Sequence, residues 1–172
     1  MKLFEDETDL LLFPPLRSGW ALKGQDAPVP ISGSNAKRIL FGTLNIETGT
    51  RLFLARPRQR SIDCRVFLYH LAYHYRGWHI ALVWDEDSCH IAGLTQAMAG
   101  NLGIELLWLP KRSPHLNPLD HLWRHGKERI SANHQYQSID EHVEQFTAYL
   151  GSLSPEEALR KAGVLSEDFW IY

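Results

Sequence analysis

The chain has 172 residues, of which 44% are hydrophobic and 22% are charged, and this composition is typical of a single globular domain over residues 1–172. Its formal net charge of −2 excludes an overall positive field, so any contact with nucleic acid must use local basic patches. Two cysteines are too few for a disulfide framework, and the sequence shows neither a signal peptide nor an apolar run long enough to cross a membrane, so we expect a cytoplasmic protein with no membrane partner.

The first third of the chain is rich in strand-forming residues. A strand candidate at residues 2–5 ends at Asp6, and turn residues at positions 47–49 separate two apolar runs, which predicts a β-hairpin. The predicted strands of this region cover residues 2–5, 17–23, 38–46 and 51–55.

The rest of the chain alternates helical and strand patterns. Predicted helices cover residues 61–76, 90–101, 139–150 and 155–163, and predicted strands cover residues 78–84 and 104–109. Helical spacing assigns the buried face of the first helix to Ile62, Val66, Tyr69 and Tyr73. This order predicts an α/β fold in which helices flank a mixed sheet. Parallel strands carry sites at their carboxyl ends, where Asp6 and Asp85 are predicted to lie.

Residues 109–123, LPKRSPHLNPLDHLW, combine a turn-rich lead with a helix start. Asn117 is a good N-cap and Pro118 suits the first helical position. Asp120 therefore falls in the first turn, where the backbone N–H groups favour negative charge. Helical spacing places Leu119, Leu122, Trp123 and Ile130 on one buried stripe, and Asp120, Arg124 and Lys127 on a different face.

This stretch resembles the signature of the mariner-like insertion-sequence transposases, a branch of the DDE/DDD superfamily. The matching positions are Leu109-Pro110, Ser113-Pro114, Leu116-Asn117-Pro118, Leu119-Asp120, Trp123 and Lys127. The string from Phe4 to Thr8, with its Asp6-Glu7 pair, resembles the first motif of the family. Val83-Trp84-Asp85, followed by His90, resembles the second. Thirty-four residues separate Asp85 from Asp120, as expected for the family, although Glu86 stands where the family usually has Asn.

The resemblance implies a ribonuclease-H-like fold with a mixed five-stranded sheet, and a transposase that cleaves DNA strands and transfers them. Its catalytic and metal-binding residues would be Asp6, Asp85 and Asp120, holding two Mg²⁺ or Mn²⁺ ions. The chemistry is reasonable because two divalent ions can activate the attacking oxygen and stabilise the leaving oxygen, and Mg²⁺ prefers carboxylate ligands. Gathered carboxylates without a cation would repel one another.

Further roles follow from the same resemblance. Glu7, His90 and Asn117 are expected to support the site, and the expected DNA contacts are Lys111, Arg112, Arg124 and Lys127. The expected partners are transposon ends, target DNA and further copies of the chain in an active homo-oligomer. Full-length relatives carry a helix-turn-helix region before the first aspartate. We expect that region to be absent from this chain and supplied as a separate or fused part.

Three alternatives stay open from the sequence. One is a metal-dependent nuclease of the same fold, which cuts DNA without joining it. Another is a catalytically silent remnant that acts as a DNA-binding or interaction domain. A zinc site is the third, but its residues lack zinc-finger spacing and no H-E-x-x-H string is present, so we interpret them as surface or core residues. The residues concerned are Cys64, His70, His74, His79, Cys89 and His90.

Overall fold

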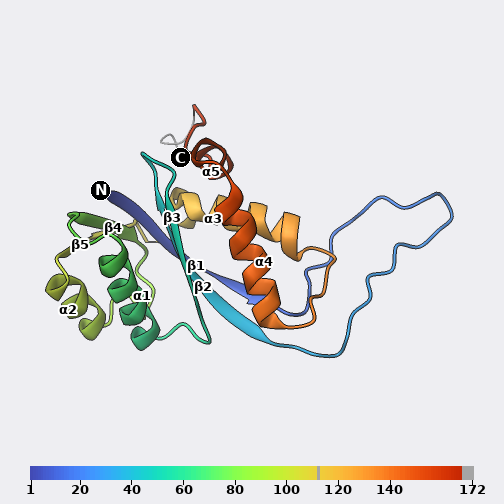
Figure 1. Ribbon diagram of the computed structural model, residues 1–172, viewed down its shortest axis with the longest axis horizontal. Coiled ribbons are helices and arrows are strands. Elements are labelled where there is room, and N and C mark those ends of the chain that lie inside the picture. Colours follow the sequence, from blue (N-terminus) through green and yellow to red (C-terminus); the bar gives the residue numbers. More distant parts are fainter. Residues whose placement is uncertain (112, 168–172) are drawn as a thin grey trace.

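The computed structural model describes residues 1–111 and 113–167. Within these residues, five strands form one sheet in the order β3-β2-β1-β4-β5 (Figure 1). The strands are β1 (Lys2–Leu11), β2 (Lys37–Asn45), β3 (Arg51–Arg56), β4 (Ile80–Trp84) and β5 (Ile104–Trp108). β1, β2 and β3 pair antiparallel, whereas β1, β4 and β5 pair parallel. The predicted mixed five-stranded sheet is therefore confirmed, and β1 lies where its two halves meet.

Helices cover both faces of this sheet. They are α1 (Ser61–His74), α2 (Gly93–Asn101), the 3-10 turn η1 (Pro114–Leu116), α3 (Pro118–Gly126), the π-helical turn η2 (Lys127–Ser131), α4 (Ile139–Ser152) and α5 (Pro155–Lys161). None of the helices in the described residues is long and apolar enough to cross a membrane.

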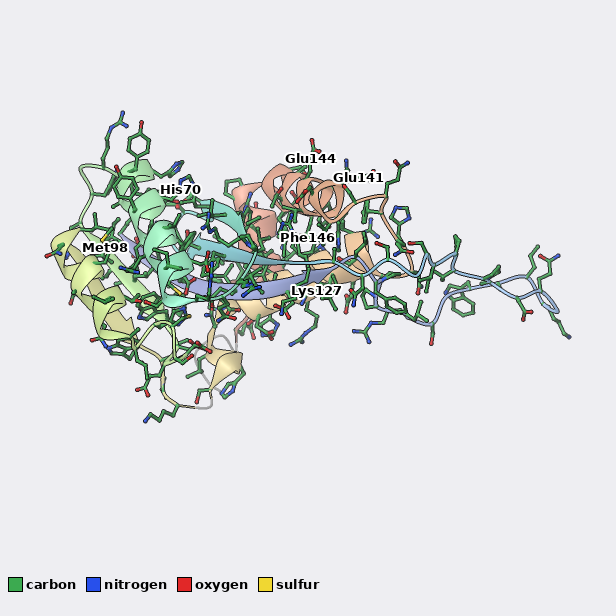
Figure 2. All side chains as sticks on the ribbon, turned by 90° about the horizontal axis from the view of Figure 1, so that it is seen from below. His70, Met98, Lys127, Glu141, Glu144 and Phe146 are labelled. Atoms are coloured by element: carbon green, nitrogen blue, oxygen red, sulfur yellow. The ribbon has the colours of Figure 1, made fainter. Side chains whose placement is uncertain are left out.

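The core has two main parts, one on each face of the sheet. On one face, Leu3 and Leu82 pack with Leu71 of α1 and with Ala99 of α2. On the other face, α3 and α4 pack on β1 and β2. There, α4 turns Phe146 toward the sheet and Glu144 toward solvent (Figure 2). Alternation along β1 therefore decides which face each of its side chains joins.

The predicted strand at residues 17–23 is wrong. Residues 12–36 contain no strand or helix, and they form the long exposed loop that projects between β1 and β2 (Figure 1). Prolines at positions 14, 15, 28 and 30 remove backbone donors from this segment. A strand-like composition is insufficient without a neighbouring sheet edge to pair with.

The predicted end of the first strand at Asp6 is also wrong. β1 continues to Leu11 because β2 pairs with it along its whole length, and Asp6 lies opposite Gly42. The parallel pairing with β4 does end early, at Phe4 opposite Val83. Asp6 and Asp85 each lie two residues beyond this last pair, so the sheet still aligns them.

The buried face predicted for α1 is wrong as well. Ile62, Tyr69 and Tyr73 are 45%, 60% and 64% exposed, respectively. The buried side chains of α1 are Asp63, Cys64, Phe67, Leu68 and Leu71. α1 carries two apolar stripes, and helical periodicity alone does not indicate which one meets the sheet.

Gly42 provides a test of how α3 is seated on the sheet. A Cβ atom at Gly42 would lie 2.5 Å from the ring of Trp123, three residues after Asp120. Gly42→Ala should therefore displace α3 and lower the free energy of unfolding by roughly 1–3 kcal/mol, as overpacking does. Thermal melts would check this. Gly100→Ala is the matched control, because no atom lies within 4 Å of its new Cβ and alanine favours the helix. Equal stability of Gly42→Ala and the parent would contradict the close packing.

Candidate active site

The three predicted acids come from separate elements of the fold. Asp6 lies in β1, Asp85 directly follows β4, and Asp120 is in the first turn of α3. Asp6 and Asp120 line one cavity of about 500 Å³, and Asp85 lines a second of about 490 Å³. The negative charges of Asp85 and Asp120 both raise the pKa of Asp6, so both carboxylates lie near enough to act on Asp6.

Asp6 is the most perturbed of the three. Burial, followed by the charge of Glu7 and then those of Asp85 and Asp120, raises the pKa of Asp6 to about 7. The folded protein therefore disfavours the ionised carboxylate at this position, as expected where carboxylates gather in a partly buried site. A cation placed among the three acids would relieve this cost.

Asn117 fixes the start of α3 against the central strand. Its side-chain oxygen accepts a hydrogen bond from the backbone N–H of Leu119 at 3.1 Å, which is the predicted N-cap. Its amide nitrogen donates to the backbone carbonyl of Glu5 at 2.6 Å. Asn117, the N-cap of α3, is thereby bonded to Glu5, the residue before Asp6.

His90 joins the first and second motifs. The predicted helix from residue 90 begins only at Gly93, and His90 lies in the turn before it. The imidazole is 1% exposed and stacks on Trp84, with 4.3 Å between ring centres. Its Nδ1 lies 2.9 Å from Asp85 Oδ1, and its Nε2 lies 2.9 Å from Glu7 Oε1. His90 therefore fixes the orientation of the Asp85 carboxylate.

The hydrogen bonds of His90 shift the pKa values of both His90 and Asp85. Burial lowers the pKa of His90, but hydrogen bonds to Asp85 and then to Cys64, Cys89 and Glu7 raise it above its ordinary range. The same hydrogen bond from His90 is the largest cause of the lowered pKa of Asp85. The surroundings of Asp85 thus favour its ionised form, whereas those of Asp6 disfavour it.

Glu5 is a site residue that sequence reasoning missed. Its side chain is 1% exposed and lies 3.7 Å from His90 Nε2. Neither carboxylate oxygen has a hydrogen-bond partner among the residues that the structure describes. Burial, and then the charge of Glu7, raise the pKa of Glu5 well above its usual value. The alternation of β1 could have indicated this position, since Glu5 and Glu7 share one face of the strand.

The basic residues expected to contact DNA differ in their surroundings. Arg124 forms an ion pair with Asp120 at 2.7 Å, and exposed Lys111 forms one with Glu86 at 3.2 Å. Lys127 lines the cavity of Asp6 and Asp120, and burial lowers the pKa of its ammonium group. Arg112 lies outside the described residues. Arg124 and Lys127 therefore lie among the acids themselves.

Comparisons with known proteins place these features in a family. The family model described as DDE superfamily endonuclease matches residues 2–142. The insertion element IS630 uncharacterized 39 kDa protein of Shigella sonnei is 29% identical over 154 residues, which is 88% of this chain and 45% of that protein. The chain thus spans about half the length of the curated relative that it matches.

Solved structures of the Mos1 mariner transposase share the fold. The paired end complex with Mg aligns with a TM-score of 0.76 and 18% identity over 98% of this chain and 53% of the other. The isolated catalytic domain aligns with a TM-score of 0.68 and 16% identity over 98% of this chain and 78% of the other. These likenesses confirm the expected ribonuclease-H-like fold. Because the family model matches most of this chain, the chain belongs to the DDE superfamily endonucleases.

Proposed function

We propose that the chain is the catalytic domain of a DDD transposase, with Asp6, Asp85 and Asp120 as its catalytic carboxylates. The observation that supports the proposal is that Asp6 of β1 and Asp120 of α3 line one cavity, while the charge of Asp85, which follows β4, also acts on Asp6. Carboxylates that line a cavity and have pKa values shifted by burial and by neighbouring charges are typical of catalytic sites. The substrates would be transposon ends and target DNA.

The donor set fits two Mg²⁺ or Mn²⁺ ions. All three proposed ligands are carboxylates, which suit hard divalent cations, and a cation among them would offset the burial and the negative charges that raise the pKa of Asp6. When bound, such ions supply Lewis-acid activation of the attacking oxygen and stabilise the leaving oxygen. The related Mos1 structures include paired end complexes with Mg and with Mn.

The surrounding residues have distinct proposed roles. His90 is a positioning residue, since its Nδ1 holds one oxygen of Asp85 and leaves the other to a metal ion. Asn117 holds Asp120 opposite Asp6 through its bond to β1. Arg124 and Lys127 would contact the DNA phosphates next to the acids, and Lys111 and Arg112 would contact DNA further along.

A nuclease of the same fold is the second candidate, because the same three acids would serve DNA cutting without joining. Mos1 has been seen both as a paired end complex and as a strand transfer complex. By this likeness we propose that the active form is a homo-oligomer that holds DNA ends. Helix-turn-helix modules, fused or separate, would recognise those ends.

A plasmid assay tests the proposal. With Mn²⁺ or Mg²⁺, the purified chain should nick supercoiled plasmid DNA, and with chelator or Ca²⁺ it should not. Supplying an oligonucleotide with a free 3′-hydroxyl distinguishes the two candidates, since a transposase joins it to the plasmid and a nuclease does not. A folded protein that shows neither nicking nor a metal-dependent rise in its melting temperature would refute the catalytic assignment.

A further inference from the structure

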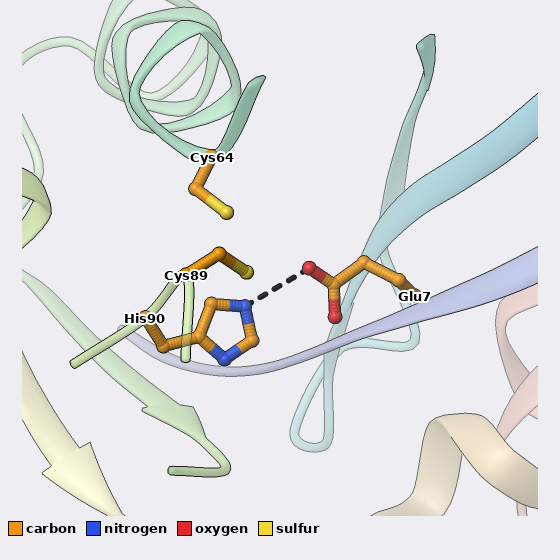
Figure 3. A group of neighbouring side chains, drawn as sticks. All are labelled: Glu7, Cys64, Cys89 and His90. Atoms are coloured by element: carbon orange, nitrogen blue, oxygen red, sulfur yellow. Dashed lines mark hydrogen bonds and ion pairs between the residues drawn. The ribbon is translucent and has the colours of Figure 1, made fainter. Parts of the chain in front are cut away.

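Four side chains that the three aspartates do not account for lie together beside Asp85. Glu7 comes from β1, Cys64 from α1, and Cys89 and His90 from the turn that follows β4 (Figure 3). One carboxylate oxygen, two sulfurs and one imidazole nitrogen all lie within 4.8 Å of one another. We propose that these four residues, the thiol site, bind one zinc ion that is distinct from the ions of the aspartates.

The four ligand atoms lie near enough to one another to reach a four-coordinate zinc geometry by small side-chain shifts. Ordinary Zn–S and Zn–N bond lengths in a tetrahedron place the ligand atoms about 3.3–3.8 Å apart. His90 Nε2 and Glu7 Oε1 are 2.9 Å apart, so a small side-chain shift would admit an ion between them. Two sulfurs, one imidazole and one carboxylate are all common zinc ligands.

The chemistry of the site selects zinc over the ions of the aspartates. Thiolates are soft ligands that Zn²⁺ and Co²⁺ accept, whereas Mg²⁺ prefers oxygen ligands in an octahedron. Both cysteines are free thiols, and they are 1% and 5% exposed. Zinc would therefore enter as the chain folds, and its binding free energy would stabilise the folded protein.

Hydrogen bonds hold the turn that carries Cys89 in place. The buried hydroxyl of Thr95 donates to the backbone carbonyl of Cys89 at 2.8 Å, and it lies 3.0 Å from the hydroxyl of Ser61 at the start of α1. Asp87 Oδ1 accepts the backbone N–H of Cys89 at 3.0 Å. The turn that carries Cys89 is thus held against the helix that carries Cys64, which is the support that a metal site needs.

The surroundings of the thiol site also favour a cation. Glu5 lies 3.7 Å from His90 Nε2, it is buried, and its oxygens have no hydrogen-bond partner in the described part of the chain. His90 faces Asp85 with Nδ1, and its Nε2, which lies 2.9 Å from Glu7 Oε1, is the nitrogen that would bind the ion after releasing its proton. This is the carboxylate–histidine–zinc arrangement, in which the carboxylate orients the ring. The zinc would connect β1, α1 and the turn after β4, and it would hold Asp85 through His90.

Cobalt binding to the full chain tests the proposal, because both cysteines of the protein belong to the thiol site. The protein is reduced with a phosphine, stripped with chelator and titrated with Co²⁺. We expect near-ultraviolet thiolate-to-cobalt absorption and the visible bands of tetrahedral cobalt, both saturating at one ion per chain. Zn²⁺ should abolish these bands and raise the melting temperature, whereas excess Mg²⁺ should leave the bands unchanged.

Variants assign the signal to its residues. Cys64→Ser and Cys89→Ser should each weaken the near-ultraviolet band and lower cobalt affinity at least tenfold. His74→Ala, an exposed histidine on the same helix as Cys64, should change neither. Asp120→Asn should keep the cobalt spectrum while losing the Mn²⁺ response, which separates this inference from the proposed catalytic function.

Two results would overturn the zinc assignment. One is a reduced, folded parent protein that takes up Co²⁺ without thiolate absorption or takes up none. The other is a Cys64–Cys89 disulfide that forms in air while the reduced protein ignores both Co²⁺ and Zn²⁺. Since the parent protein alone gives these readings, the test holds even where a serine variant fails to fold.

Discussion

Replacing Asp6 by asparagine is expected to abolish metal-dependent DNA cleavage while making the metal-free protein more stable. Several kcal/mol of transition-state stabilisation depends on the ions, and each 1.36 kcal/mol is tenfold in rate, so the loss should be on the order of 10³-fold or more. The gain in stability arises because burial and the neighbouring carboxylates raise the pKa of Asp6 to about 7. Cleavage assays and thermal melts of the two proteins measure both effects.

The pH dependence of the Asp6→Asn effect has a definite sign. The pKa of Asp6 is higher in the folded chain than its ordinary value of 3.8, so the folded state binds more protons between pH 4 and about 7. The contribution of Asp6 to stability is therefore present below pH 4 and is lost as the pH rises through about 7. Asparagine does not titrate. The variant should melt like the parent near pH 4 and at a higher temperature near pH 8.

Metal ions should reverse the order of the two proteins. An ion that binds only the folded state stabilises it by roughly 2.7 kcal/mol at a hundredfold excess over its Kd. For the parent this corresponds to a rise in Tm of about 5–10 °C, and Asp6→Asn should lose most of it. Asp140→Asn, the same change at an exposed helix position, removes a surface ion pair with Arg38 and should shift the melting temperature by no more than about 1–3 °C while leaving cleavage and the metal response unchanged. A metal-free Asp6→Asn protein that melts below the parent would show that Asp6 has a structural role instead.

Replacing Asp85 by asparagine should also abolish cleavage, but with the opposite effect on metal-free stability. Asp85 accepts hydrogen bonds from His90 Nδ1 and from the backbone N–H of Asp87, and the bond from His90 is the main cause of its lowered pKa. Asparagine keeps an acceptor but removes the charge opposite the buried imidazole. We expect a loss on the order of 1 kcal/mol, since the charge adds about that to a hydrogen bond. The melting temperature should fall by roughly 2–4 °C.

The comparison of the two variants is more informative than either alone. Both lose cleavage and the Mn²⁺ response, yet one melts higher and the other lower without metal. A shared direction of the metal-free change would contradict the environments described for the two carboxylates. Retained cleavage in Asp85→Asn would remove that residue from the catalytic set.

The sequence by itself determined the elements that local patterns encode. The strand-forming residues and the turn at positions 47–49 predicted β2 and β3, and the apolar runs predicted β4 and β5. The N-cap at Asn117 was equally readable, because a cap depends on residues two or three positions away. The three proposed catalytic aspartates were predicted from a family signature, which marks positions in the sequence without showing where their side chains lie in the fold.

Tertiary structure alone decided features that depend on partners distant in sequence. β1 runs beyond Asp6 because β2 pairs with it, residues 17–23 are not a strand because they lie in the loop that projects away from the sheet, and α1 buries one of two apolar stripes. The thiol site shows this most clearly, since Glu7, Cys64 and His90 have no readable spacing. Local sequence patterns indicate the conformation of a segment. Which segments become neighbours depends on strand pairing and burial across the whole fold. The proposed zinc site draws its ligands from three separate parts of the chain, so it depends entirely on how those parts pack.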